Sequence, residues 1–138
     1  MRRGAVLALL PAVALAPAAC GGVKAADLLL VERSGSTAGA HLTLLVDEEG
    51  VVHCNGGPAL KVSDPQLVQA RAIQEELEKP AGEGLKLPPR PGSVLSYTVH
   101  DEQGTVRFSD NSAGQPKVLR QLALYVLQVA QQVCRLPE

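Results

Sequence analysis

Hydrophobic and polar residues alternate along several short stretches of the chain, a period that predicts β-strands with one buried face. The alternation is clearest where polar residues separate Leu95, Tyr97 and Val99. The expected strands cover 28–33, 41–46, 51–54, 95–100 and 105–109. Gly50 and Gly104 stand in the turns between consecutive strands, where glycine tolerates the backbone of a tight hairpin. We therefore expect about five strands, four of them in two hairpins.

Two further segments carry hydrophobic residues three and four positions apart, which is the period of an amphipathic helix. In the first segment Ser63 can cap the helix, and Gln66 is placed to complete a capping box. Pro80 is expected to end this helix, and the second helix is expected over 116–134. The apolar stripes are Leu67, Ala70, Ile73 and Leu77 in the first helix, and Val118, Leu122, Tyr125, Val126, Val129 and Val133 in the second.

The order of these elements is β, then ββα twice. Two amphipathic helices and about five strands must share one core, because neither layer can bury its apolar side alone. The simplest arrangement is a single antiparallel sheet with both helices on one face. The predicted fold class is therefore α+β.

A long segment without predicted structure separates the two halves. Residues 79–93 contain four Pro and three Gly, and loops of this length in a compact domain are often functional or disordered. The part 87–91 favours an extended polyproline conformation. Two interpretations remain open: a stiff crossover, or a partner-contact loop in which Leu85, Leu87 and Arg90 are the contact residues.

Composition sets the scale of the protein and excludes some classes. The chain has 138 residues, which allows one substantial domain, and its 46% hydrophobic and 20% charged residues exclude a disordered polyelectrolyte. Thirteen Lys and Arg against fourteen Asp and Glu give a net charge of −1, so no basic surface for nucleic acid is expected. With only three aromatic residues, the core must consist mainly of Leu, Val and Ala.

The N-terminus has the composition of an export signal. Met1-Arg2-Arg3 is a short basic start, the apolar run 4–16 follows, and small residues precede Cys20. The apolar run is shorter than the roughly 20 residues of a membrane span, and prolines interrupt it. We expect a signal peptide over 1–19, a tether over 20–26 and a single domain over 27–138.

The junction Ala18-Ala19-Cys20-Gly21-Gly22 resembles the lipobox of bacterial lipoproteins. The resemblance implies that the thiol of Cys20 receives a diacylglyceryl group and that the mature protein is held in the lipid bilayer at the extracytoplasmic face of the cell membrane. The family usually has Leu where Pro17 stands. Cleavage at an Ala-x-Ala-like site would instead release a soluble protein. The signal, the junction and the small domain together resemble uncharacterised exported lipoproteins of actinobacteria.

An exported protein reaches an oxidising compartment, where disulfides form. With Cys20 used by lipid, Cys54 and Cys134 remain as a pair; the alternative is two buried free thiols. A bond between them would join the end of a strand to the end of the last helix. Chain-entropy reasoning gives a bridge over so long a loop about 4 kcal/mol.

Residue patterns that carry catalysis or metal binding are not found. His41, His53 and His100 have no second ligand at the spacing of a zinc site, and the acidic residues cluster at turns and on a solvent-facing helix side. We expect no enzyme, no metal and no cofactor, but a binding or structural module with another envelope protein as partner. A runner-up is a protease inhibitor, because the order of hairpin, Cys, helix and hairpin resembles that of subtilisin-inhibitor-like proteins; a small hydrolase comes third.

Overall fold

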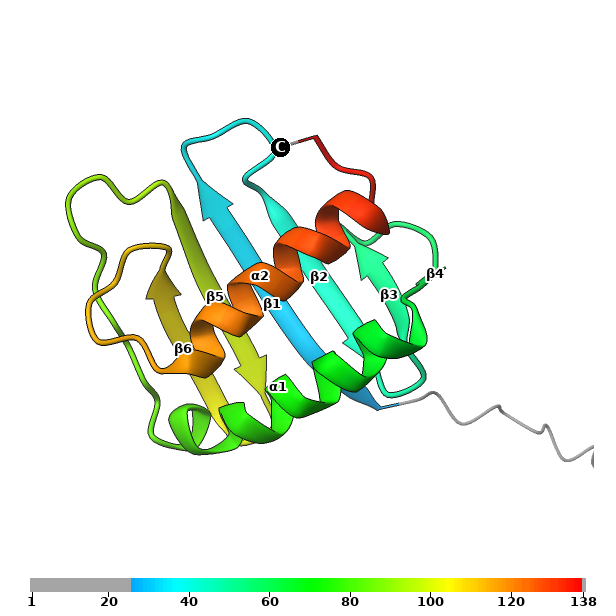
Figure 1. Ribbon diagram of the computed structural model, residues 1–138, viewed down its shortest axis with the longest axis horizontal. Coiled ribbons are helices and arrows are strands. Elements are labelled where there is room, and N and C mark those ends of the chain that lie inside the picture. The colour runs from blue at the N-terminus through cyan, green and yellow to red at the C-terminus, as the bar shows by residue number, and fades with distance from the viewer. Residues whose placement is uncertain (1–25, 138) are drawn as a thin grey trace, which may run out of the picture.

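The structure is a computed structural model that describes residues 26–137. It contains one six-stranded antiparallel sheet and two helices, with the strands in the order β4-β3-β2-β1-β5-β6 (Figure 1). The elements are β1 (Asp27–Gly35), β2 (Leu42–Asp47), β3 (Val51–Cys54), β4 (Leu60–Lys61), α1 (Asp64–Gly82), β5 (Leu95–Asp101), β6 (Gly104–Ser109) and α2 (Lys117–Gln132).

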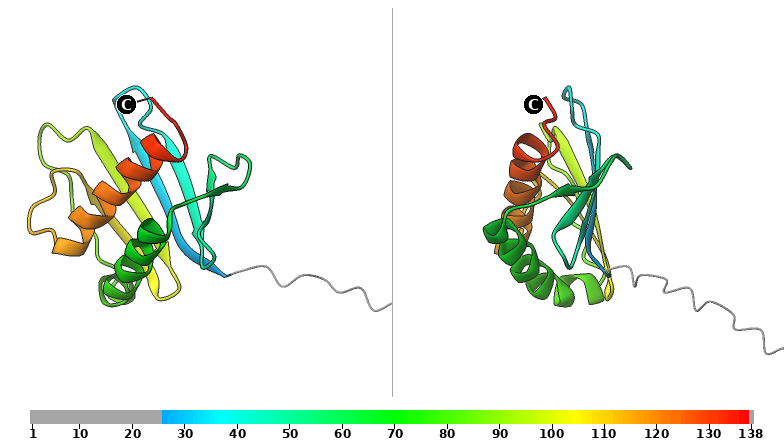
Figure 2. Two further views of the ribbon diagram at one scale, coloured as in Figure 1. Left: turned by 45° about the vertical axis from the view of Figure 1, so that its right-hand side comes forward. Right: turned by 90° about the vertical axis from the view of Figure 1, so that its right-hand side faces the viewer.

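The predicted α+β architecture is confirmed. Both helices cover the same face of the sheet, and the opposite face is left open (Figure 2). The sheet has one strand more than the sequence predicted, because β4 pairs its two residues with Val51 and Val52 of β3. A strand of two residues is too short to show the alternation from which strands are predicted.

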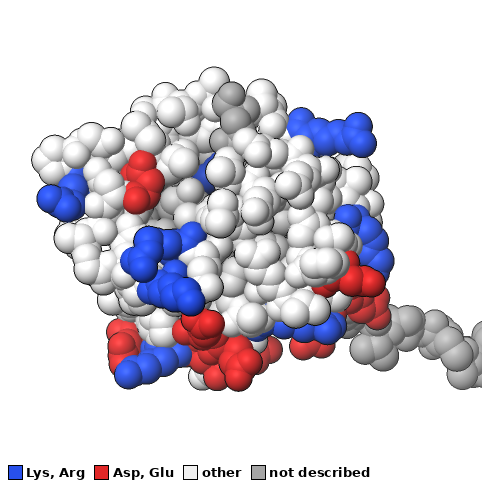
Figure 3. All heavy atoms as spheres, in the orientation of Figure 1, with Lys and Arg blue, Asp and Glu red and all other residues white. Residues whose placement is uncertain are grey.

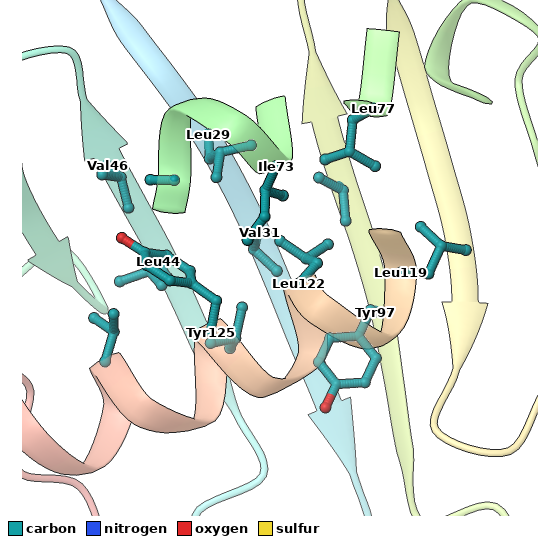
Figure 4. Packing of buried hydrophobic residues seen from close by; sticks show 14 of the residues in the cluster. Leu29, Val31, Leu44, Val46, Ile73, Leu77, Tyr97, Leu119, Leu122 and Tyr125 are labelled. Carbon is teal, nitrogen blue, oxygen red and sulfur yellow. The ribbon is translucent and has the colours of Figure 1, made fainter. Parts of the chain in front are cut away.

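β1 lies between the two hairpins and pairs with a strand on each side. Val31 of β1 faces Leu44 of β2 on one side and Val99 of β5 on the other. Leu29 and Val31 are buried toward the helices, together with the inward residues of the neighbouring strands (Figure 4). The core is thus built from aliphatic side chains at alternate strand positions, as the pattern predicted.

α1 begins as predicted and ends later. The Ser63 hydroxyl accepts a hydrogen bond from the Gln66 N–H (3.3 Å), and the Gln66 side chain accepts one from the Ser63 N–H (2.9 Å), which completes the capping box. The prediction that Pro80 ends the helix is wrong, since the helix continues to Gly82. Near the end of the helix proline removes only one hydrogen bond, while the Glu83 N–H still donates to the Lys79 carbonyl (3.0 Å). The segment without secondary structure therefore begins four residues later than expected.

α2 packs across the middle of the sheet and buries seven residues, among them Leu119, Leu122 and Tyr125. The hydroxyl of Tyr125 is buried and has no hydrogen-bond partner within 26–137. Burial disfavours the ionised phenolate and raises the pKa of Tyr125 to about 12. Figure 4 shows the side chain of Tyr125 beside Leu44 of β2. Its ring supplies volume to a core that contains few other aromatic residues.

The predicted disulfide between Cys54 and Cys134 is present, with the two Cα atoms 5.9 Å apart. Cys54 is the last residue of β3, and Cys134 lies two residues beyond the end of α2. The bond therefore joins the outer part of the sheet to the segment that leaves the helix layer.

Removing this bond should lower the stability of the domain. We expect the double substitution Cys54→Ser and Cys134→Ser to reduce the free energy of unfolding by about 2–5 kcal/mol, because the 80-residue loop is no longer closed in the unfolded chain. Thermal unfolding followed by circular dichroism measures this loss as a drop of several degrees or more in melting temperature. An unchanged melting temperature, or free alkylation of both thiols in the folded wild type, would contradict the prediction.

Candidate binding loop

Residues 83–94, here called the proline loop, connect the end of α1 to β5. The loop runs along the outer side of β6, at the edge of the sheet (Figure 1). It contains Pro88, Pro89 and Pro91, which restrict φ along its central part. The shape of the loop therefore depends on the contacts at its base and at its tip.

The base of the proline loop is attached to the sheet. The Leu87 N–H donates to the Arg107 carbonyl (2.8 Å), and the Arg107 N–H donates to the Leu85 carbonyl (2.9 Å), so that Lys86 forms a parallel bridge with β6. The side chains of Leu85 and Leu87 are half-buried and pack against the core. Both residues thus have a structural role, and a role in partner contact stays a prediction for them.

Asn111 holds the tip of the loop. Its side-chain oxygen accepts a hydrogen bond from the Arg90 N–H (2.9 Å), and its amide nitrogen donates to the carbonyls of Arg90 (3.1 Å) and Pro91 (3.2 Å). One side chain therefore binds the backbone on both sides of the Arg90 Cα atom. Ser112 adds a further bond from its hydroxyl to the Leu87 carbonyl (3.3 Å).

Asp110 holds the end of the loop where it enters β5. Its carboxylate accepts hydrogen bonds from the Ser93 hydroxyl (2.7 Å) and from the Val94 N–H (3.2 Å). Partial burial alone would raise the pKa of Asp110, but the bond from Ser93 and those from nearby backbone N–H groups outweigh it, so the pKa lies below its ordinary value. The carboxylate is therefore ionised at neutral pH.

These bonds leave Arg90 as the charged residue at the tip. Its side chain is exposed, and among the described residues its guanidinium makes no ion pair or hydrogen bond. Pro88, Pro89 and Pro91 beside it are also exposed. The loop therefore presents a cation and three proline rings on a backbone that is already held in place.

An apolar groove of about 440 Å³ lies at the base of the loop, between the end of α1 and the start of α2. Leu85, Pro80, Pro116 and Val118 line it, and charged side chains stand at its rim. Figure 3 shows acidic and basic side chains close together over the lower half of this face. Leu85 belongs both to this groove and to the base of the proline loop.

The other candidate residues are not brought together. The His53 ring lies 2.8 Å from the Gly57 carbonyl, His100 pairs with Glu32 (3.2 Å), and His41 is exposed before β2. Within 26–137, no group of three or more His, Cys, Asp or Glu side chains has the arrangement of a metal site. Cys20, the predicted lipidation site, lies outside the described residues. No helix in the described part of the chain is long and apolar enough to cross a membrane.

The residues that hold the loop were not predicted from the sequence. Asp110, Asn111 and Ser112 form the turn after β6, about twenty residues beyond the loop in the chain. Short polar residues after a strand indicate a turn but not what their side chains bind. Only the pairing of β5 with β6 brings this turn beside the proline loop.

Comparisons with known proteins give no relative for this chain. No protein-family model matches it, and neither a curated protein nor a solved structure matches it.

The contribution of Asp110 should depend on pH. Because its pKa is lower in the folded state than the ordinary value of about 3.9, its contribution is present above that pH and is lost as the pH falls through the folded-state pKa. We expect Asp110→Asn to melt below the wild type at pH 7, and the difference to shrink below about pH 4.

Differential scanning calorimetry at several pH values checks this expectation. Glu102→Gln is a matched control, since Glu102 is exposed and makes no hydrogen bond among the described residues. This control should melt close to the wild type at pH 7. A difference between wild type and Asp110→Asn that stays constant from pH 7 to pH 3 would count against the role of Asp110.

Proposed function

We propose that this protein is a non-catalytic binding module, anchored through lipid at Cys20 to the extracytoplasmic face of the cell membrane, and that the proline loop is its contact with another envelope protein. The observation that carries the proposal is the bracing of the loop by Asp110 and Asn111. A loop held before binding loses little conformational entropy when it meets a partner. A larger part of the interaction free energy then contributes to the affinity for the partner.

The chemistry at the tip defines the partner that would fit. An exposed guanidinium binds best to a carboxylate, which it can contact through two parallel hydrogen bonds. Extended proline-rich segments dock in grooves lined by aromatic side chains. The partner is therefore a protein with an acidic residue beside an aromatic or apolar groove.

One observation favours the second candidate function, protease inhibition. Asn111 binds the N–H and the carbonyl of Arg90 and so holds the backbone on both sides of this residue, as an inhibitory loop that resists rearrangement in an active site requires. If the protein is an inhibitor, Arg90 would enter an acidic specificity pocket of the protease. The same variants test both functions.

Anchoring is tested first, by phase partition in Triton X-114 and by intact mass. We expect the wild type in the detergent phase with an increased mass on its N-terminal peptide, because acyl chains bind detergent micelles. Cys20→Ser should move to the aqueous phase. A wild type that stays in the aqueous phase with an unmodified Cys20 thiol would refute the anchor and leave the loop proposal standing.

Partner binding is tested by crosslinking and pull-down from envelope extracts with wild type, Arg90→Ala and Arg107→Ala. Arg107 is an exposed arginine on β6 whose side chain makes no hydrogen bond or ion pair among the described residues, so it is a matched control. We expect Arg90→Ala to reduce capture at least tenfold, the loss of about 1.4 kcal/mol or more, while Arg107→Ala leaves it unchanged.

Capture that survives Arg90→Ala would exclude the tip of the loop as the contact. Capture of an active serine protease, with loss of its activity on wild type but not on Arg90→Ala, would favour the inhibitor over the general binding module.

A further inference from the structure

The outer side of α2 carries no charge over about three turns. Lys117 and Arg120 stand in its first turn, and no charged residue follows before Arg135. Residues at spacings of three and four form a row on the side that faces away from the sheet. This row, here called the α2 stripe, consists of Gln121, Leu124, Gln128 and Gln131.

Leu124 stands out within the α2 stripe. It is 51% exposed and is one of three large hydrophobic residues exposed in the described domain, with Val68 and Val94. The outer side of α1, by contrast, carries several charges in its second half. Figure 3 shows an uncharged area over the centre of this face, with basic side chains to the left of it and charged side chains along the lower edge. Arg120 lies one turn before Leu124, and after Leu124 no charged residue follows in α2. Depletion of charge of this kind is typical of the centre of a protein interface.

We propose that the α2 stripe binds the same stripe of a second copy of this chain across a two-fold axis. Arg2 and Arg3 are the only charged residues before Cys20, so the mature chain has 11 basic and 14 acidic residues and a net charge of −3. Two such chains repel each other, and a face without charge is where this repulsion is weakest. The outer side of α2 carries no charge from Gln121 to Gln132, so two copies of this part do not repel each other.

The side chains of the stripe are also complementary to themselves. In a two-fold interface each residue can meet its own counterpart. A glutamine amide carries both donors and an acceptor, so Gln128 of one copy can pair with Gln128 or Gln121 of the other. Leu124 of each copy would cover Leu124 of the other and remove both from water.

The place where the chain enters the domain suits this arrangement. β1 starts at Asp27, at one end of the sheet, and the helix layer lies on a side of the strands (Figures 1 and 2). A two-fold axis parallel to the strands therefore puts both N-terminal ends on the same side of a dimer. The seven residues 20–26 can span at most about 25 Å, enough for both copies to reach one bilayer. This step rests on the proposed anchor at Cys20, and so does the net charge of −3, which requires cleavage before Cys20.

α2 runs obliquely across the strands (Figure 1), so in such a dimer the two copies of α2 cross near their middle. The crossing keeps Lys117 of one copy away from Arg135 of the other. A single helix crossing buries less than the roughly 1,200–2,000 Å² of a stable complex, so the dimer is weak in dilute solution. Confinement to a membrane raises the effective concentration and strengthens the pairing.

Site-specific crosslinking tests the proposal. Leu124→Cys in membranes, under mild oxidation, should give a disulfide-linked dimer on a non-reducing gel. Ser96→Cys, an exposed position on β5 at the open face of the sheet, is the matched control and should give at least tenfold less. The wild type, treated in the same way, measures how much disulfide-linked dimer forms through Cys20. Equal yields at the two positions, or none at Leu124→Cys, would overturn the proposal.

Sedimentation of the detergent-solubilised chain gives a second readout. Leu124→Glu places two carboxylates opposite each other and should weaken self-association at least tenfold, whereas Ser96→Glu should leave it unchanged. The Leu124→Cys crosslink repeated at high protein concentration in a Cys20→Ser chain separates the two proposals. A dimer there without detergent partition of the wild type supports the pairing and rejects the anchor, and no dimer in either chain rejects the pairing.

Discussion

Hydrogen bonds on both edges of β1 hold the two halves of this domain together. β1 pairs with β2 on one side and with β5 on the other, so each hairpin becomes part of a six-stranded sheet. A hairpin alone is marginally stable, and the inward residues of one hairpin are too few to bury a helix. The helices, the disulfide and the proline loop all depend on this shared sheet, because each is attached to strands from one half or the other.

The features that the sequence predicted correctly are local. Alternation marked the long strands, and Ser63 with Gln66 marked the start of α1, because these signals depend on neighbours in the chain. β4 was missed because two residues carry no period, and Pro80 misled because proline is tolerated in the last turns of a helix. The Asn111 brace could not be foreseen, since it depends on the register between β5 and β6. The position of β1 between the hairpins is likewise a property of the folded chain.

Two polar groups are buried in this core, and they differ in whether a hydrogen-bond partner is present. Arg33 continues the inward row of Leu29 and Val31, and its guanidinium donates to the carbonyls of Gly39 and Ala40 (both 3.0 Å), which ties the loop after β1 to the sheet. The Tyr125 hydroxyl has no such partner in the described part of the chain, and leaving it unpaired costs about 1–3 kcal/mol. Burying its large ring opposes this cost, since a fully buried aromatic side chain contributes a comparable amount.

The two proposed surfaces are connected through one short segment. The turn that braces the proline loop follows β6 and leads, within a few residues, into α2, so Arg90 and the α2 stripe are held in a set relation to each other. Pairing through α2 would therefore display two proline loops at a defined separation on one membrane. Two weak contacts offered together bind a dimeric or repeated partner far more tightly than either alone, provided the spacing matches. The hydrogen bonds from Asp110 and Asn111 keep the two loops at a fixed spacing. A mobile loop would lose part of the binding free energy as conformational entropy on binding.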